Sequence, residues 1–143
     1  MKTHVIFVTA SVFLAQGLTN SDTKNPFDLE DMECLIKSGI NPQTVINNIN
    51  DKLKVTEGVP SLNKFLECVG RRIGVTRQNG DLDFGFIRKE LVAKLIPILR
   101  NDNVRNKDGL ADDAIEKCMD VASQEVDERI IKFHNCVVDA ITV

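Results

Sequence analysis

The segment CMDVASQEVDERIIKFHNC, residues 118–136, holds two of the chain's four cysteines with a charged run between them. Apolar residues on both sides of that run recur at three- and four-residue steps, which predicts two helices joined by a turn. Cys118 and Cys136 each lie nine residues from Asp127. In an antiparallel hairpin that bends at Asp127, both cysteines stand about 13 Å along their helices at 1.5 Å per residue. The geometry therefore favours a disulfide between Cys118 and Cys136.

The N-terminus indicates export of the protein. Lys2 precedes the apolar run VIFVTASVFLA, and Ala15 and Gly17 supply the small residues of a cleavage site. This pattern is typical of a secretory signal peptide, so we expect residues 1–17 to be removed and residues 18–143 to form a single domain. A membrane anchor is the alternative, but a bilayer requires about 20 apolar residues and this run is shorter.

Export determines how the cysteines are interpreted. In an oxidising compartment an even number of cysteines forms a disulfide framework, whereas cytosolic thiols more often bind metals or act in catalysis. Four cysteines allow three pairings, and the hairpin leaves Cys34–Cys68 by elimination. No C-x-x-C pair is present and only His134 lies near a cysteine, so we expect no metal site. Each bridge should stabilise the fold by about 3–4 kcal/mol.

Apolar residues at helical spacing continue through nearly the whole chain, which predicts an all-α fold. Asn25-Pro26 and Asn41-Pro42 are typical helix starts, and Gly39 and Gly74 are typical helix ends. The predicted helices cover residues 26–38, 42–53 and 61–73, a stretch from 83 that Pro97 kinks or ends, and the two arms of the hairpin around a turn at 124–128; residues 100–109 form a loop.

The charge balance excludes some partners. The chain carries 18 basic and 21 acidic side chains, and the net charge is about −4 once Lys2 is removed with the signal peptide. No basic face stands out, so neither nucleic acid nor anionic lipid is expected as a partner. No stretch after residue 17 is apolar enough to insert into a membrane.

These features together resemble the insect odorant-binding protein family, and the four cysteines are similar to its "minus-C" subgroup. In the family's six-cysteine pattern, the second cysteine lies four positions before the third, and the fifth lies nine before the sixth. Lys64 and Asp127 occupy those two positions here, and the four cysteines match the first, third, fourth and sixth. The resemblance implies bridges from first to third and from fourth to sixth, in agreement with the hairpin geometry.

The resemblance extends over the whole chain. The stretch GRRIGVTRQNGDLDF, residues 70–84, is similar to the family's turn into the fourth helix. One departure is the interval of forty-nine residues between Cys68 and Cys118, which is longer than usual in the family. We expect the loop at residues 101–109 to absorb the excess.

The resemblance implies a secreted, extracellular carrier in which six short helices, pinned by two disulfides, surround an apolar cavity. Such a cavity takes up odorants, pheromones or fatty-acid-like molecules, and no cofactor is implied. The protein partners that the resemblance allows are a membrane chemoreceptor and a second copy of the chain. The candidate lining residues are Phe65, Leu66, Ile73, Phe84, Phe86, Ile87, Leu91, Leu95, Phe133, Val137 and Ile141.

Composition suggests how this cavity would treat polar ligands. Residues 18–143 contain five phenylalanines and no tryptophan or tyrosine, so they lack the aromatic donors that often orient polar groups. We expect a pocket that is mostly blind to hydrogen-bonding groups. The alternative for each candidate is an ordinary packed core position, and we expect about half of the candidates to touch a ligand.

Two other classes of function are alternatives to the carrier. A hydrolase would need a nucleophile with an imidazole base, and His134 is the only histidine after residue 17, so we expect no enzyme. The paired acids Asp112-Asp113 and Asp81/Asp83 are expected to be helix-start and turn residues. The other class is a venom, salivary or reproductive-fluid protein that uses the same scaffold to bind a protein or sequester a host molecule.

Two further hypotheses concern single residues. His134 is expected to be a partly exposed surface residue, with the alternative that its protonation loosens the last helix and releases ligand. Lys64 and Asp127 have opposite charges, so they could form an ion pair where six-cysteine relatives carry a third bridge. The alternative is that they are unrelated solvent-facing charges.

Overall fold

The computed structural model describes residues 27–100, 104–124 and 128–142. Within these residues the fold is all-α, as predicted, and the only strand-like pairings are two isolated bridges, Ile49 with Val55 and Thr76 with Leu82. The helices are α2 (Leu29–Ser38), α3 (Pro42–Asn47), α4 (Pro60–Ile73), α5 (Phe84–Glu90), the π-helical turn η2 (Leu91–Leu95), α6 (Ile96–Leu99), α7 (Lys107–Gln124) and α8 (Arg129–Thr142).

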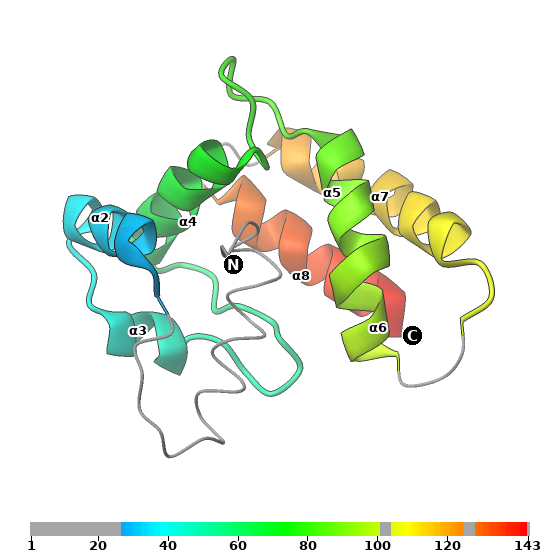
Figure 1. Ribbon diagram of the computed structural model, residues 1–143, viewed down its shortest axis with the longest axis horizontal. Coiled ribbons are helices and arrows are strands. Elements are labelled where there is room, and N and C mark those ends of the chain that lie inside the picture. The colour runs from blue at the N-terminus through cyan, green and yellow to red at the C-terminus, as the bar shows by residue number, and fades with distance from the viewer. Residues whose placement is uncertain (1–26, 101–103, 125–127, 143) are drawn as a thin grey trace.

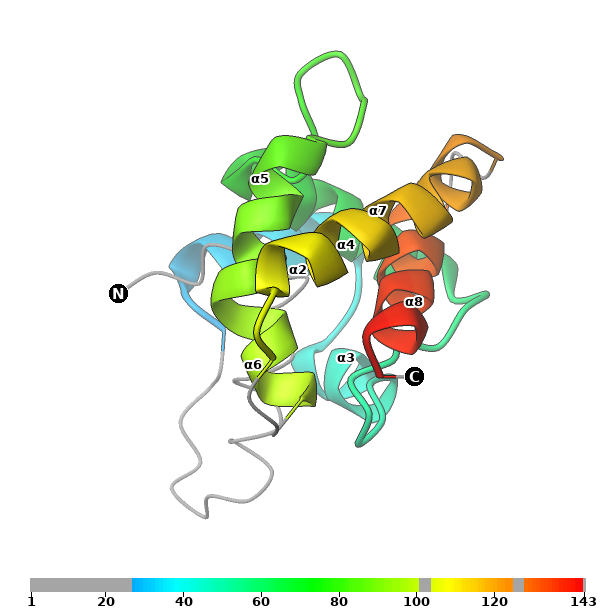
Figure 2. The ribbon, with the colours of Figure 1, turned by 90° about the vertical axis from the view of Figure 1, so that its right-hand side faces the viewer.

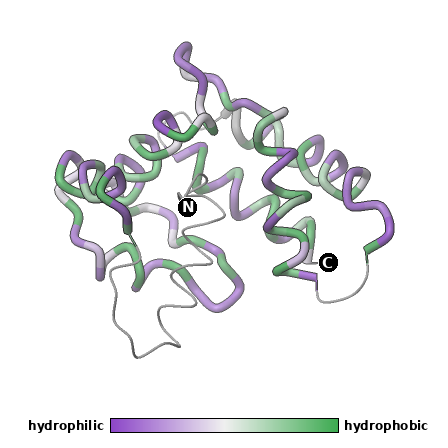
Figure 3. Tube along the Cα trace, in the orientation of Figure 1, coloured by the Kyte–Doolittle hydropathy of each residue, from purple (hydrophilic) through white to green (hydrophobic). Residues whose placement is uncertain are grey.

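Helix α8 runs across the centre of the view in Figure 1 and lies at one side of the fold in Figure 2. It packs against α4 on one side and against α6 and α7 on the other, while α2 packs on α4 (Figure 1). The loop between α4 and α5 stands away from the body in both ribbon views (Figure 2). Hydrophobic and hydrophilic residues alternate along the helices, as expected of amphipathic helices that each bury one side (Figure 3).

Two disulfides join neighbouring helices. Cys34–Cys68 links α2 to α4 with the Cα atoms 5.7 Å apart, and Cys118–Cys136 links α7 to α8 with the Cα atoms 5.8 Å apart. The second bridge crosses the hairpin whose arms end at Gln124 and begin again at Arg129. One bridge thus holds the pair α2–α4 and the other holds the pair α7–α8, and the two pairs meet where α4 packs against α8.

Local sequence accounts for several helix ends. Asn41 caps α3 by accepting the Thr44 N–H at 2.8 Å, with Pro42 in the first turn. Gly39 and Gly74 end α2 and α4 with φ of 68° and 105°, a left-handed conformation that glycine adopts without strain. The prediction for the start of α2 was wrong: the helix begins at Leu29, because Asp28 and Asp31 form a capping box.

The second predicted helix is shorter than expected, since α3 ends at Asn47 and not at residue 53. The Asn48 side chain donates to the Thr44 carbonyl at 2.7 Å, and Asn50 Oδ1 accepts the backbone N–H groups of Lys52 and Lys54. Asparagine side chains that bond to nearby backbone offer it an alternative to the helix. Residues 48–58 form a loop for this reason.

The fourth helical run changes its geometry next to Pro97, where a kink or an end was predicted. It does not end at Pro97 but continues to Leu99, and the turn before the proline is π-helical, with the Ile96 N–H bonded to the Leu91 carbonyl. Because proline lacks an N–H and its ring crowds the carbonyl four residues back, a wider turn accommodates it. Helix α7 starts at Lys107, inside the predicted loop, because Asn106 caps it by accepting the Gly109 N–H at 2.9 Å.

Candidate functional site

The eleven predicted lining residues come from α4, α5, η2 and α8, and all of them belong to the hydrophobic core or pack against it. Ile73, Phe84 and Phe86 keep part of their surface exposed. The other eight are buried: Phe65, Leu66, Ile87, Leu91, Leu95, Phe133, Val137 and Ile141. The structure therefore gathers side chains from four elements into one apolar group.

Aromatic contacts mark two places in this group. The rings of Phe84 on α5 and Phe133 on α8 lie 5.6 Å apart between centroids and are tilted by 56°. The rings of Phe27 and Phe65 meet edge to face at 5.9 Å. Both arrangements are typical of favourable aromatic pairs. Phe84 and Phe133 thus connect the two sides of the candidate site.

Several other buried residues belong to the same core but were not among the predicted lining residues. Leu62, Val69, Ile131 and Val138 are almost fully buried, and Phe27 is 6% exposed. The signal for α8 was present in the sequence, because Ile130-Ile131 and Val137-Val138 place apolar residues on more than one face. A helix that is apolar nearly all round is expected in the interior of a protein.

The prediction for His134 was wrong, because it is not a surface residue. Its side chain is 2% exposed, and its Nε2 atom lies 2.6 Å from the Leu53 carbonyl oxygen, which can only accept a hydrogen bond. Burial lowers the pKa of His134 to about 4, and the bond to Leu53 opposes that shift. His134 is therefore neutral at physiological pH and donates from Nε2.

The neighbouring residue Asn135 holds the same loop. Its Oδ1 atom accepts the Val55 N–H at 2.8 Å, and its Nδ2 atom donates to the Val55 carbonyl at 2.7 Å. Leu53, whose carbonyl accepts the hydrogen bond from His134, has φ of 65°, which is uncommon for a residue other than glycine. His134 and Asn135, which are adjacent on α8, thus hold the loop at residues 48–58 against this helix through hydrogen bonds.

We expect low pH to destabilise the fold through the protonation of His134. The pKa of His134 in the fold is below its unfolded value of 6.5, so the unfolded chain takes up the proton first as the pH falls. The contribution of His134 to the free energy of unfolding is therefore complete above pH 6.5 and falls as the pH drops to about 4. Between pH 7.5 and pH 5 this contribution falls by about 2 kcal/mol. Urea unfolding at both pH values measures the loss, which should be much smaller in His134→Gln.

An equal loss in wild type and variant would contradict that account. The hypothesis that protonation of His134 also releases ligand remains a prediction. Ligand affinity that is unchanged between pH 5 and pH 7.5 would argue against it.

A buried ion pair joins α2 to the last turn of α4. Asp31 is fully buried, and its Oδ1 atom lies 2.9 Å from Arg72 Nη2. Arg72 also donates to the Glu30 carbonyl and approaches Cys34 Sγ at 3.2 Å. Burial raises the pKa of Asp31, the nearby Asp28 carboxylate adds to the rise, and Arg72 opposes it. This cluster surrounds the Cys34–Cys68 bridge.

Two of the acidic residues that a hydrolase might use, Asp83 and Asp112, have structural partners. Asp83 caps α5 by accepting the Phe86 N–H, and this bond lowers its pKa. Asp112 binds Arg88 at 2.5 Å between Oδ1 and Nε, so it joins α7 to α5; it lies in the second turn of α7 and not at the helix start as expected. Within the described residues, no three His, Cys, Asp or Glu side chains gather as metal ligands.

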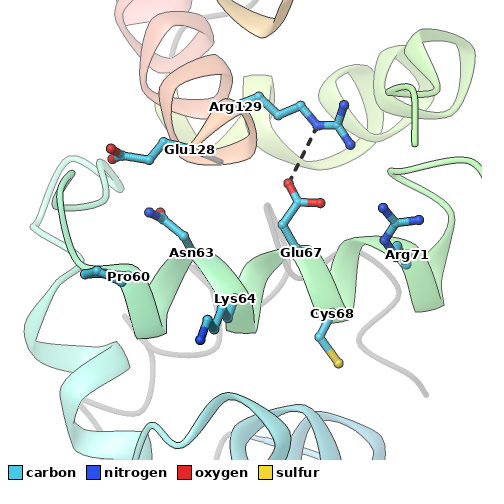
Figure 4. A pocket seen from close by; sticks show the side chains of 8 residues that line it. All are labelled: Pro60, Asn63, Lys64, Glu67, Cys68, Arg71, Glu128 and Arg129. Carbon is cyan, nitrogen blue, oxygen red and sulfur yellow. Dashed lines mark ion pairs between the residues drawn. The ribbon is translucent and has the colours of Figure 1, made fainter. Parts of the chain in front are cut away.

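The predicted ion pair between Lys64 and Asp127 remains a prediction, because Asp127 lies outside the described residues. Lys64 is exposed, and its side chain points away from the start of α8 (Figure 4). Another pair joins these helices instead. Arg129 Nε and Glu67 Oε2 lie 3.6 Å apart, and both side chains are mostly buried.

These features define a small, disulfide-bonded helical protein with an apolar interior and no recognisable catalytic group in the parts of the chain described. Among the helices of those parts, none is both long and apolar enough to cross a membrane. The model of the PBP/GOBP family matches residues 18–140, and the chain belongs to this family, the insect odorant-binding proteins. Its four cysteines fit the minus-C subgroup. No curated protein and no solved structure matched the chain.

The family consists of small carriers that bind odorants and pheromones, and not of enzymes. The chain is therefore, in general terms, a carrier of small hydrophobic molecules.

Proposed function

We propose that this protein is a secreted carrier that takes up one small hydrophobic molecule between α4, the α5–η2 run and α8. One observation carries the proposal: apolar side chains from these elements gather in one group, with Phe84 and Phe133 in contact across it. Membership of the PBP/GOBP family supports the same conclusion. We expect the ligand to contact about half of the eleven candidate lining residues.

Apolar burial alone is sufficient for useful affinity. A ligand of 12–16 carbons gains about 10 kcal/mol on burial at about 0.8 kcal/mol per CH₂, before the entropy of association is subtracted. Among the buried polar side chains of the described residues, Thr76 has no hydrogen-bond partner for its Oγ1 atom, whereas Asp31, His134 and Asn135 are bonded to Arg72, Leu53 and Val55. The last three groups are engaged by the protein, so we expect ligand choice to follow size and shape more than hydrogen bonding.

Secretion is part of the proposal. Two observations support it: the family match begins at residue 18, directly after the predicted signal peptide, and both disulfides are formed. Disulfides persist in oxidising compartments and are rare in the cytosol. Mass measurement of the exported protein tests the cleavage after Gly17.

Truncating Phe84 should weaken ligand binding. Phe84→Ala removes a partly exposed ring from the proposed wall, and we expect the affinity for a fluorescent apolar probe to fall about tenfold, the equivalent of about 1.4 kcal/mol. Titration of the probe, followed by its displacement with long-chain alcohols, esters or acids, provides the measurement. Leu29→Ala is the matched control, because Leu29 is 87% exposed on α2.

Equal probe affinity in wild type and Phe84→Ala would place the ligand elsewhere. Unfolding curves of both variants show whether the fold is intact. A loss of affinity as large in Leu29→Ala would also count against the proposed wall.

One observation favours the second candidate function, a secreted protein that binds another protein. Leu29 and Ile36 lie seven residues apart on α2, hence on one face, and are 87% and 77% exposed. Exposed apolar residues that share a face are typical of contact surfaces. Absence of any probe displacement, together with a stable complex with a second protein, a chemoreceptor or another copy of the chain, would favour this function over the carrier.

A further inference from the structure

A groove on the surface runs along α4 and reaches the start of α8, apart from the buried apolar group. It encloses about 760 Å³ and is lined by α4 residues from Pro60 to Arg71 and by Glu128 and Arg129 (Figure 4). That volume is in the range of small-molecule sites, which span about 300–1,000 Å³. Lys64, at the position of the family's second cysteine, is one of the lining residues.

The spacing of residues on α4 arranges charge along this groove. Asn63, Glu67 and Arg71 follow at intervals of four, so they share the face of α4 that is turned to α8. Glu67 forms the 3.6 Å ion pair with Arg129 through the Nε atom of the arginine. The remaining nitrogens of the Arg129 guanidinium extend beyond this pair to the end of the groove where Arg71 stands (Figure 4).

The two guanidinium groups converge at Gly80, in the loop between α4 and α5. A Cβ atom placed on Gly80 would lie 3.9 Å from Arg71 Nη2 and 3.9 Å from Arg129 Nη2. The two nitrogens are therefore at most about 8 Å apart, twice that distance. Two oxygens of one anion can bridge such a gap, because charge-assisted N–H···O bonds are about 2.7–2.9 Å long.

Both arginines have N–H groups that can donate hydrogen bonds to an anion. Arg71 is exposed and forms no ion pair with any residue that the structure describes. The Arg129 side chain is 14% exposed; its Nε atom faces Glu67, and its Nη2 atom is the one that lies near Gly80. At the end of the groove near Gly80, the two guanidinium groups of Arg71 and Arg129 face only one carboxylate of the described lining, that of Glu67, while Glu128 lies toward Pro60 (Figure 4).

We propose that this groove is a second ligand site, which binds the anionic group of a small organic molecule between Arg71 and Arg129. Carboxylates and phosphates fit this chemistry, because arginine forks bind their paired oxygens. The organic part of the ligand would lie along α4 toward Pro60. The site goes beyond the proposed carrier function and does not depend on the buried apolar group.

Calorimetric titration of the mature, oxidised protein at low ionic strength tests the site, with hexanoate as the probe and hexan-1-ol as its uncharged match. We expect hexanoate to bind at least tenfold more tightly than hexan-1-ol. Arg71→Gln should weaken hexanoate binding at least fivefold. Arg105→Gln is the matched control, since it removes the same charge at an exposed residue that does not line the groove.

Equal affinity for hexanoate and hexan-1-ol, or equal weakening in Arg71→Gln and Arg105→Gln, would overturn the proposal. Inorganic phosphate is the third probe, and an affinity equal to that of hexanoate would contradict the organic part of the ligand. Phe84→Ala separates the two sites: it should reduce binding of the apolar probe and leave the Arg71-dependent binding of hexanoate unchanged.

Discussion

Replacing Arg72 with methionine is expected to lower the free energy of unfolding by about 3 kcal/mol or more at pH 7. The variant leaves the fully buried Asp31 carboxylate without the guanidinium that lies 2.9 Å away, and removing one member of a buried pair costs about 3–5 kcal/mol. Methionine keeps most of the side-chain volume. Urea unfolding monitored by circular dichroism provides the measurement.

The pH dependence of this loss has a definite sign. The pKa of Asp31 is raised in the fold, so the folded protein takes up the proton before the unfolded chain as the pH falls. Protonation removes the stranded charge, and the loss in Arg72→Met should therefore shrink toward pH 4. The double variant Asp31→Asn/Arg72→Met should regain most of the stability at pH 7.

Arg77→Met is the matched control for the buried pair. Arg77 faces Asp83 at 3.6 Å, but its side chain is 58% exposed, and exposed pairs contribute about 0–1 kcal/mol. Equal losses in Arg72→Met and Arg77→Met would show that burial of Asp31 contributes nothing.

Removing either disulfide is the second change with a large expected effect. On the chain-entropy model, Cys118→Ala/Cys136→Ala should cost about 3 kcal/mol for a bridge between residues 18 apart, and Cys34→Ala/Cys68→Ala about 4 kcal/mol for residues 34 apart. The order follows from loop length, because the longer loop loses more entropy when it is closed. Guanidinium unfolding of both double variants at pH 7 gives the two values.

The reverse order would indicate that contacts around the bridges dominate over loop closure. Arg72 Nη1 lies 3.2 Å from Cys34 Sγ, so the alanine variant at that bridge also changes the surroundings of the buried ion pair. Comparing Cys34→Ala/Cys68→Ala in the wild-type and Arg72→Met backgrounds separates the two contributions.

The parts of the fold that sequence reasoning predicted well are those that short-range rules govern. The equal distance of Cys118 and Cys136 from the bend is a property of an antiparallel hairpin, and the structure joins these cysteines. Asn41 with Pro42 and the glycines at 39 and 74 act through hydrogen bonds and backbone angles within one turn. Such features are local, so the sequence alone is enough to identify them.

The errors have two sources, which are contacts between distant residues and local alternatives that apolar spacing does not distinguish. His134 and Asn135 form hydrogen bonds with Leu53 and Val55, about eighty positions away. No local sequence pattern indicates that pairing. The wider helical turn before Pro97 was equally hidden, because a proline in a helix can end it, kink it or be accommodated. The end of α3 depended on a competition between asparagine side chains and the helix, which apolar spacing does not show.

The candidate site shows the same division. Helical spacing selected residues that do gather in the interior, since eight of the eleven are buried and the others pack against them. The contact of Phe84 with Phe133 depends on how α5 crosses α8, which spacing within each helix does not specify. The convergence of Arg71 and Arg129 at Gly80 likewise needs the fold, because three separate segments meet there.

Native mass spectrometry of the mature, oxidised protein tests the central claim most directly. The protein is incubated with an unbranched alcohol of 12–16 carbons and, separately, with a sugar of similar mass. The account predicts a chain of residues 18–143 with two disulfides and one alcohol molecule bound per chain, and no bound sugar. A correctly oxidised chain that retains no apolar molecule, or that retains alcohol and sugar equally, would contradict a carrier of small hydrophobic ligands.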